Sequence, residues 1–156
     1  MTLTSTGLRA AADRLIAAAA EPLQCEPVRD LLGEADVVSA YAVQRLLTED
    51  SLRPGRRIVG HKIGLTSPAV QRQLGVDQPD FGVLFADMQV ASGATVATDT
   101  LLQPEVEAEI AFILAEDLDG DLSDSRIRAA AGVAIAAIEI VDSRARLVDQ
   151  HCRHHR

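Results

Sequence analysis

Apolar and polar positions in the first third of the chain follow helical spacing. Over residues 7–20 apolar side chains recur at intervals of three and four, which predicts an amphipathic helix. A second helix is predicted over residues 36–52, with Asp36 as a candidate N-cap before the run VVSAYAVQRLL. Residues 22–35 are predicted to connect the two helices. The Arg-Pro-Gly sequence that follows ends the second helix, so residues 1–55 are predicted to be a helical region.

The middle of the chain changes to shorter elements. The run RRIVGHKIGL, residues 56–65, is predicted to be a strand. Residues 67–75 are predicted to form a short helix, capped by Ser67 and closed by Gly75. Residues 76–88 contain proline and glycine and are predicted to be mostly loop.

From residue 94 onward the pattern turns to β-structure. Residues 94–98 and 103–114 are predicted strands, residues 123–137 are predicted to be helical, and residues 136–143, AAIEIVDS, are predicted to be a buried strand. Helices therefore come first, followed by strands with a helix between them. This order favours an α+β fold over a doubly wound sheet.

One predicted strand carries three carboxylates at alternate positions. Glu105, Glu107 and Glu109 share one face of residues 103–114 at steps of about 7 Å, because successive strand side chains point to opposite faces. The apolar residues between them share the other face. Three like charges side by side indicate either a solvated surface or a bound cation.

Glu139 favours the second explanation. It lies among alanine and isoleucine in AAIEIVDS, and an unpaired buried carboxylate costs several kcal/mol unless it is protonated, hydrogen-bonded or bound to a cation. Two strand glutamates two residues apart, with one acid from a second strand, can hold a divalent ion. Hard oxygen ligands favour Mg²⁺ or Mn²⁺, and such an ion can hold a 2-oxo acid by its carboxylate and carbonyl oxygens and stabilise the enolate.

Composition limits the classes of partner and compartment. The 156 residues are 47% apolar, with 15 basic against 23 acidic residues and a net charge of −8, which disfavours nucleic acid and anionic membranes as partners. No apolar run approaches the ~20 residues that span a bilayer. Cys25 and Cys152 form neither a disulfide framework nor a zinc motif, which favours a cytoplasmic protein.

Lys62 stands out among the basic residues, because it is the one lysine and the other 14 of the 15 are arginine. Lysine can lose its proton when it is desolvated, whereas arginine effectively cannot. Lys62 and Asp80, which lies in a Pro-Asp-Phe-Gly sequence, are therefore candidates for proton transfer. Coding bias is the alternative explanation for Lys62, and a turn-forming role is the alternative for Asp80.

Three segments resemble one enzyme family. GHKIGLTSPAVQRQLGVDQPDFGVLFADM (60–88), QPEVEAEIAFIL (103–114) and AAIEIVDSR (136–144) are similar to the 2-keto-4-pentenoate hydratase group. This group includes 2-oxo-3-hexenedioate (4-oxalocrotonate) decarboxylases and belongs to the fumarylacetoacetate hydrolase superfamily. The resemblance covers nearly all of residues 36–144, in order.

The resemblance implies a fold and a set of site residues. It implies an N-terminal helical region followed by a mixed β-roll, of which residues 56–144 would form part. It implies a Mg²⁺ or Mn²⁺ site, with Glu105 outside the ligand set. The residues that fall on the ligand and acid/base positions of the family are Glu107, Glu109 and Glu139 for the metal, and Lys62 and Asp80 for proton transfer.

The implied activity is hydration of 2-hydroxypenta-2,4-dienoate (2-keto-4-pentenoate) to 4-hydroxy-2-oxopentanoate in the meta-cleavage catabolism of aromatic hydrocarbons. Decarboxylation of 2-oxo-3-hexenedioate uses the same metal and enolate chemistry, and the sequence does not separate the two. A non-catalytic remnant or partner subunit is a further alternative. It arises because family chains continue well beyond the VDSR segment, whereas residues 145–156 resemble nothing in the family. A truncated β-roll would expose strand edges, which favours a homo-oligomer or a partner chain.

Overall fold

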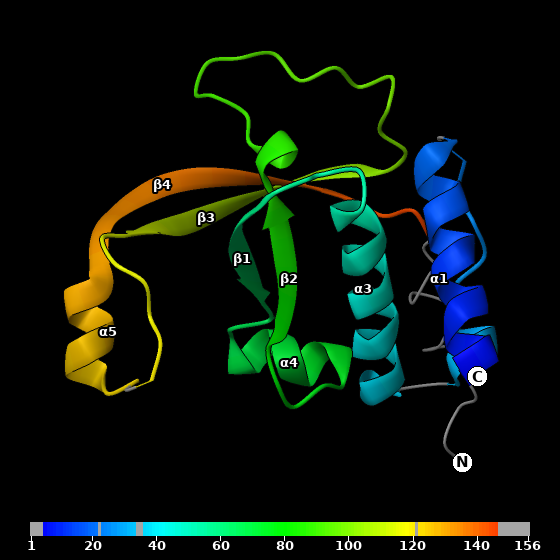
Figure 1. The fold of residues 1–156 in the computed structure, drawn as a ribbon, viewed down its shortest axis with the longest axis horizontal. Helices are drawn as coiled ribbons and strands as arrows, with labels where there is room; N and C mark the ends of the chain where they lie inside the picture. The colour runs from blue at the N-terminus through cyan, green and yellow to red at the C-terminus, as the bar shows by residue number, and fades with distance from the viewer. Residues whose placement is uncertain (1–4, 22, 34–35, 121, 147–156) are drawn as a thin grey trace.

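The fold is α+β, as the order of elements predicts. The computed structural model describes residues 5–21, 23–33, 36–120 and 122–146. Helices α1, α2 and α3 come first, and strands with intervening helices follow (Figure 1). The elements are α1 Ser5–Ala20, α2 Arg29–Leu32, α3 Val37–Leu52, β1 Ile58–Gly64, α4 Pro68–Leu74, β2 Asp80–Phe85, the 3₁₀ helix η1 Ala86–Met88, β3 Pro104–Leu114, α5 Asp124–Ala130 and β4 Ala131–Asp142.

The core of the described residues lies among the N-terminal helices. Buried side chains of α1, α2 and α3 pack together, with further partly buried leucine and valine side chains around them. Asp36 begins α3 as predicted, because its carboxylate accepts a hydrogen bond of 2.9 Å from the Ser39 amide. No helix in the described part of the chain is long and apolar enough to cross a membrane.

Two antiparallel pairs of strands make up the β-structure of the described residues. β1 pairs with β2, and β3 pairs with β4 over eleven aligned positions. Figure 1 shows β3 and β4 as a long arm that extends away from the helices and ends at α5. Cys25 forms a bridge to Ala145, so the segment between α1 and α2 is hydrogen-bonded to the segment that follows β4.

Several predicted elements are wrong. Residues 76–88, predicted as loop, contain β2 and η1, because hydrogen bonds to β1 specify a strand that its aspartate and glycine do not favour. Residues 94–98 were expected to be a strand and form none. The helix expected over 123–137 ends at Ala130, because the following residues pair with β3. The connector over 22–35 contains the short helix α2.

Ser67 and Gly75 lie at the two ends of α4, and the predicted role is confirmed for Gly75 alone. Gly75 adopts the left-handed conformation that closes the helix, as predicted. Ser67 occupies the N-cap position, but its side chain makes no capping hydrogen bond. Most of the predicted tail, residues 147–156 with Cys152, lies outside the described residues.

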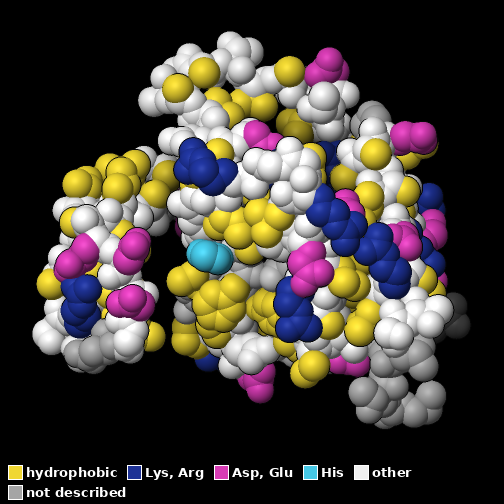
Figure 2. All heavy atoms as spheres, viewed as in Figure 1, with side chains coloured by type: hydrophobic (Ala, Val, Ile, Leu, Met, Phe, Trp, Pro, Cys, Tyr) yellow, Lys and Arg dark blue, Asp and Glu magenta, His cyan; other side chains and the backbone are white. Residues whose placement is uncertain are grey.

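The prediction that β4 is a buried strand is also wrong. The register places the apolar side chains that alternate with the glutamates on the face opposite them, and there Val106 is 70% exposed and Ile138 is 72% exposed. Figure 2 shows such apolar side chains along the β3–β4 arm. The reason is that the described residues supply only two strands here, with no layer over this face.

Candidate functional site

The pairing of β3 with β4 gathers the acidic residues. Glu107 lies directly opposite Glu139 in the register, and Glu109 lies two residues further along the same face of β3. Like charges directly opposite each other destabilise a sheet. The alternation of glutamates is therefore a feature that the strand pairing alone does not favour.

Three of these side chains converge on one point. One carboxylate oxygen from each of Glu107, Glu109 and Glu139 lies within 4.8 Å of the others. Glu107 and Glu109 are exposed, and Glu139 is half-buried. Glu105 is exposed on the same face and lies outside this group. The donors are all hard oxygens, which suits Mg²⁺ or Mn²⁺. We refer to these three residues as the carboxylate cluster.

Lys62 reaches this cluster from the other sheet. Its Nζ lies 2.8 Å from Oε1 of Glu139, and the side chains of Lys62 and Glu139 are 32% and 23% exposed. Glu139 was expected to be an unpaired carboxylate in a buried strand. Its side chain is instead partly exposed and forms an ion pair with Lys62. The pairing of Lys62 with Glu139 was not predicted, because the two residues are far apart in sequence and belong to different sheets.

Neighbouring carboxylates raise the pKa of Lys62. Burial of the ammonium by itself lowers the pKa of Lys62, but the hydrogen bond to Glu139 and the negative charges of Glu139, Asp80 and Glu107 outweigh it. The pKa of Lys62 therefore lies above its ordinary value. Lys62 is a cation and a proton donor in this arrangement, and it is not a free base.

Two glycines leave the space that Lys62 and Asp80 occupy. Lys62 pairs with Gly82, and a Cβ atom at Gly82 would lie 2.9 Å from Cγ of Lys62 and 3.3 Å from its Cδ. Gly64 pairs with Asp80, and a Cβ atom at Gly64 would lie 3.2 Å from Cγ of Asp80 and in collision with its Oδ1. Each candidate proton-transfer side chain therefore lies over a bare backbone on the neighbouring strand.

These glycines were missed in the sequence. Both glycines stand in short sequences that contain a candidate site residue, GHKIG and PDFG. Because PDFG was predicted to be a loop, its pairing with GHKIG, which places each glycine opposite a candidate side chain, was not predicted.

Helix α3 holds the start of β2, where Asp80 lies. The Tyr41 hydroxyl accepts a hydrogen bond of 3.0 Å from the Phe81 amide. Gln44 donates from Nε2 to the Phe81 carbonyl at 2.8 Å. Asp80 itself is exposed. The helical region therefore contributes to the site by anchoring one of its strands.

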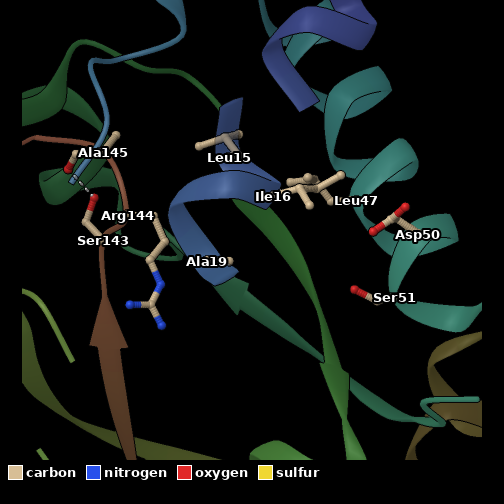
Figure 3. Close-up of a pocket in the computed structure, with 9 residues that line it drawn as sticks. All are labelled: Leu15, Ile16, Ala19, Leu47, Asp50, Ser51, Ser143, Arg144 and Ala145. Carbon is tan, nitrogen blue, oxygen red and sulfur yellow. Dashed lines mark hydrogen bonds between the residues drawn. The ribbon is translucent and has the colours of Figure 1, made fainter. Parts of the chain in front are cut away.

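A pocket elsewhere in the chain contains none of the predicted site residues. It has a volume of about 460 Å³ and lies between α1, α3 and the segment after β4 (Figure 3). Its lining residues are Leu15, Ile16, Ala19, Leu47, Asp50, Ser51, Ser143, Arg144 and Ala145. The carboxylate cluster and this pocket are thus separate features, and the candidate chemistry belongs to the cluster.

Comparison with known sequences finds hydratases. The chain is 54% identical over 144 residues to the TodF product hydratase of Pseudomonas putida F1, covering 92% of this chain and 54% of that protein. It is 55% identical over 136 residues to 2-keto-4-pentenoate hydratase 1 of Dechloromonas aromatica, covering 86% of this chain and 52% of the relative. The chain thus spans about half the length of these curated relatives. No family model matches it.

Comparison with solved structures finds the same fold. The structure matches 4-oxalocrotonate decarboxylase from Pseudomonas putida G7, complexed with magnesium and adipate, with a TM-score of 0.84 at 32% identity. The match covers 92% of this chain and 55% of that one. The same decarboxylase complexed with calcium and acetate matches with a TM-score of 0.83. The predicted N-terminal helical region followed by strands is therefore also found in part of a solved protein.

Proposed function

Because this chain belongs to the 2-keto-4-pentenoate hydratase group and spans about half the length of the curated relatives it matches, we propose that it carries the metal site and the proton-transfer residues of such a hydratase. The reaction adds water to 2-hydroxypenta-2,4-dienoate and gives 4-hydroxy-2-oxopentanoate. One proton leaves the enol oxygen and one is added at C5. Water then adds its oxygen at C4 and a proton at C3.

The convergence of Glu107, Glu109 and Glu139 is the observation that supports this proposal most directly. Three carboxylate oxygens within 4.8 Å of one another fit a divalent ion, and two of the three side chains are exposed to solvent. The related decarboxylase was solved with magnesium and with calcium. We propose Mg²⁺ or Mn²⁺ for this chain. A bound ion of this kind supplies Lewis-acid polarisation to the carboxylate and 2-oxo oxygens of the substrate.

The residues of the chain supply the proton transfers. Lys62 is held as a cation beside Glu139, so it is suited to donate a proton to carbon or to stabilise a developing negative charge. Asp80 lies close enough for its charge to act on Lys62 and offers a carboxylate that can accept the enol proton. Gly82 and Gly64 leave room for these side chains.

Decarboxylation of 2-oxo-3-hexenedioate is the second candidate function. The structural match to 4-oxalocrotonate decarboxylase favours it, but the identity to that protein is 32%, against 54% and 55% to the hydratases. The two substrates differ at the end remote from the 2-oxo acid, where the decarboxylase substrate carries a second carboxylate. We therefore favour the hydratase.

The exposed apolar face of β3 and β4 bears on assembly. Side chains such as Val106 and Ile138 are largely exposed in the described residues, and exposed apolar patches of this kind are unusual on the surface of a monomeric protein. We propose that the active species is a homo-oligomer or includes a partner chain, that it resides in the cytoplasm, and that it acts in aromatic hydrocarbon catabolism. A non-catalytic subunit is the alternative, and an assay of the purified chain separates the two.

Metal binding and turnover are tested together. Isothermal titration of the purified chain with Mn²⁺ should show binding that Glu139→Gln abolishes and that the matched control Glu105→Gln leaves intact. Loss of the dienol absorbance of 2-hydroxypenta-2,4-dienoate, with no release of CO₂ from 2-oxo-3-hexenedioate, should identify the hydratase. Equal effects of the two glutamine variants would refute the ligand set, and metal binding without turnover of either compound would indicate the non-catalytic subunit.

A further inference from the structure

Lys62 makes a contact that proton transfer does not require. Its ammonium lies 2.8 Å from Glu139, a member of the carboxylate cluster. Within the described residues this is the ion pair that reaches the cluster. A divalent ion held by the same three residues would also need an oxygen of Glu139. Lys62 and the ion therefore draw on the same carboxylate.

The position of Lys62 is set by the fold. Lys62 belongs to β1 and Glu139 to β4, so the contact joins the two sheets. The stem of Lys62 lies over Gly82, where a Cβ atom would come within 2.9 Å of its Cγ. The ammonium is thus directed at the cluster by the packing of its own stem.

The charges explain why a cation is held there. The three carboxylates carry a formal charge of −3, and Lys62 reduces the charge of the site to −2. Like charges on facing strands are destabilising, so the ammonium relieves a repulsion between Glu107 and Glu139. A divalent ion added to the remaining −2 makes the whole site neutral.

We propose that Lys62 is the internal counter-cation of the carboxylate cluster and competes with the divalent ion for Glu139. The inference rests on the proposed metal site. Lys62 stabilises the cluster before metal binds, and its positive charge opposes entry of the ion. Coulomb's law for a unit charge and a divalent ion that share one carboxylate, about 5 Å apart in a water-like dielectric, corresponds to an affinity lowered about tenfold.

The coupling acts in both directions. If the ammonium weakens metal binding, then metal binding weakens the pair between Lys62 and Glu139 by the same factor. Lys62 is thereby released from Glu139 once the ion is in place. The same residue then serves as counter-cation before metal binds and as proton donor afterwards.

The test is the Mn²⁺ affinity of the whole purified chain, measured by isothermal titration. Lys62→Gln removes the charge and keeps a hydrogen-bond donor for Glu139, so it should bind Mn²⁺ about tenfold more tightly than the unsubstituted chain. Lys62→Arg keeps the charge and should bind within about twofold of it. Arg53→Met removes one positive charge from an exposed pair with Asp50 and should leave the affinity unchanged.

The outcomes separate this inference from the metal site itself. Equal or weaker binding by Lys62→Gln, while the unsubstituted chain binds Mn²⁺, would overturn the competition and leave the metal site standing. No binding by either chain would overturn both. Lys62→Met serves as a second uncharged variant if Lys62→Gln fails to fold, and a thermal melt without metal should show both variants less stable than the unsubstituted chain.

Discussion

Replacing Gly82 with alanine tests whether the bare backbone beneath Lys62 directs its ammonium toward Glu139. The new Cβ would lie 2.9 Å from Cγ of Lys62 and 3.3 Å from its Cδ, well inside ordinary carbon–carbon contact at about 3.5–4.0 Å. Because Cγ lies at the base of the side chain, Lys62 cannot avoid the overlap by moving its end alone. It has to leave its rotamer, and the ammonium moves away from Glu139.

The expected cost of Gly82→Ala follows from three contributions. Turning Lys62 out of its rotamer costs about 0.5–1.5 kcal/mol. Loss of the partly exposed pair with Glu139 costs at most about 1 kcal/mol. Alanine restricts the unfolded chain and returns about 0.4–1 kcal/mol. The net decrease in the free energy of unfolding is therefore about 1 kcal/mol.

Gly60 provides the matched control within the same pair of strands. A Cβ atom at Gly60 would lie 4.0 Å from Cδ1 of Leu84, an ordinary contact, so Gly60→Ala should stabilise the chain by about 0.4–1 kcal/mol. Urea denaturation followed by circular dichroism should therefore separate the two variants by about 1–2 kcal/mol. Equal stability of Gly82→Ala and Gly60→Ala would contradict the reasoning.

A double-mutant cycle identifies the group responsible. In a Lys62→Ala background the stem is absent, so Gly82→Ala should no longer destabilise the chain. If the cost persists without the lysine stem, then the backbone at Gly82 is the cause and Lys62 is not positioned by it.

Three further changes have defined outcomes. Lys62→Arg should keep the positive charge but lose turnover in the active assembly, because arginine cannot give up the proton, and retained turnover would refute proton donation. Asp36→Ala should lower the melting temperature by about 3 °C through loss of the N-cap. The hydrogen bond from the Ser39 amide holds the pKa of Asp36 below its ordinary value. The stabilisation from this cap should therefore be present above pH ~4 and be lost as pH falls through the lowered pKa. Melting temperatures measured over a series of pH values would detect the loss. Asp142→Ala should cost about 2–3 kcal/mol in urea denaturation, because the carboxylate accepts from the amides of residues 102–103 at 2.9 and 2.7 Å, and a cost below about 0.5 kcal/mol would show that water replaces it.

The helical region was predictable because its signals are local. The expected helices over 7–20 and 36–52 correspond to α1 Ser5–Ala20 and α3 Val37–Leu52. Periodicity and a cap residue act within a few turns of one segment, so no knowledge of distant residues is needed.

β3 Pro104–Leu114 matches the strand predicted over 103–114, but β2 and the start of β4 were less predictable because pairing overrides propensity. β2 contains aspartate and glycine yet forms through hydrogen bonds to β1. The alanine-rich start of β4 has a helical composition, and it is extended because it pairs with the end of β3. The extended conformation of both segments depends on a partner strand that the local sequence does not specify.

The sequence by itself determined the chemistry available to this protein: three glutamates on one strand face, a fourth in a second strand, and a single lysine. These features follow from side-chain identity and from the period of a strand, both of which are local. Only the tertiary structure decided that Lys62 pairs with Glu139, that Gly82 makes room for it, and that β4 is largely exposed. Those facts depend on register and on contacts between separate sheets, where residues distant in sequence are brought together by packing.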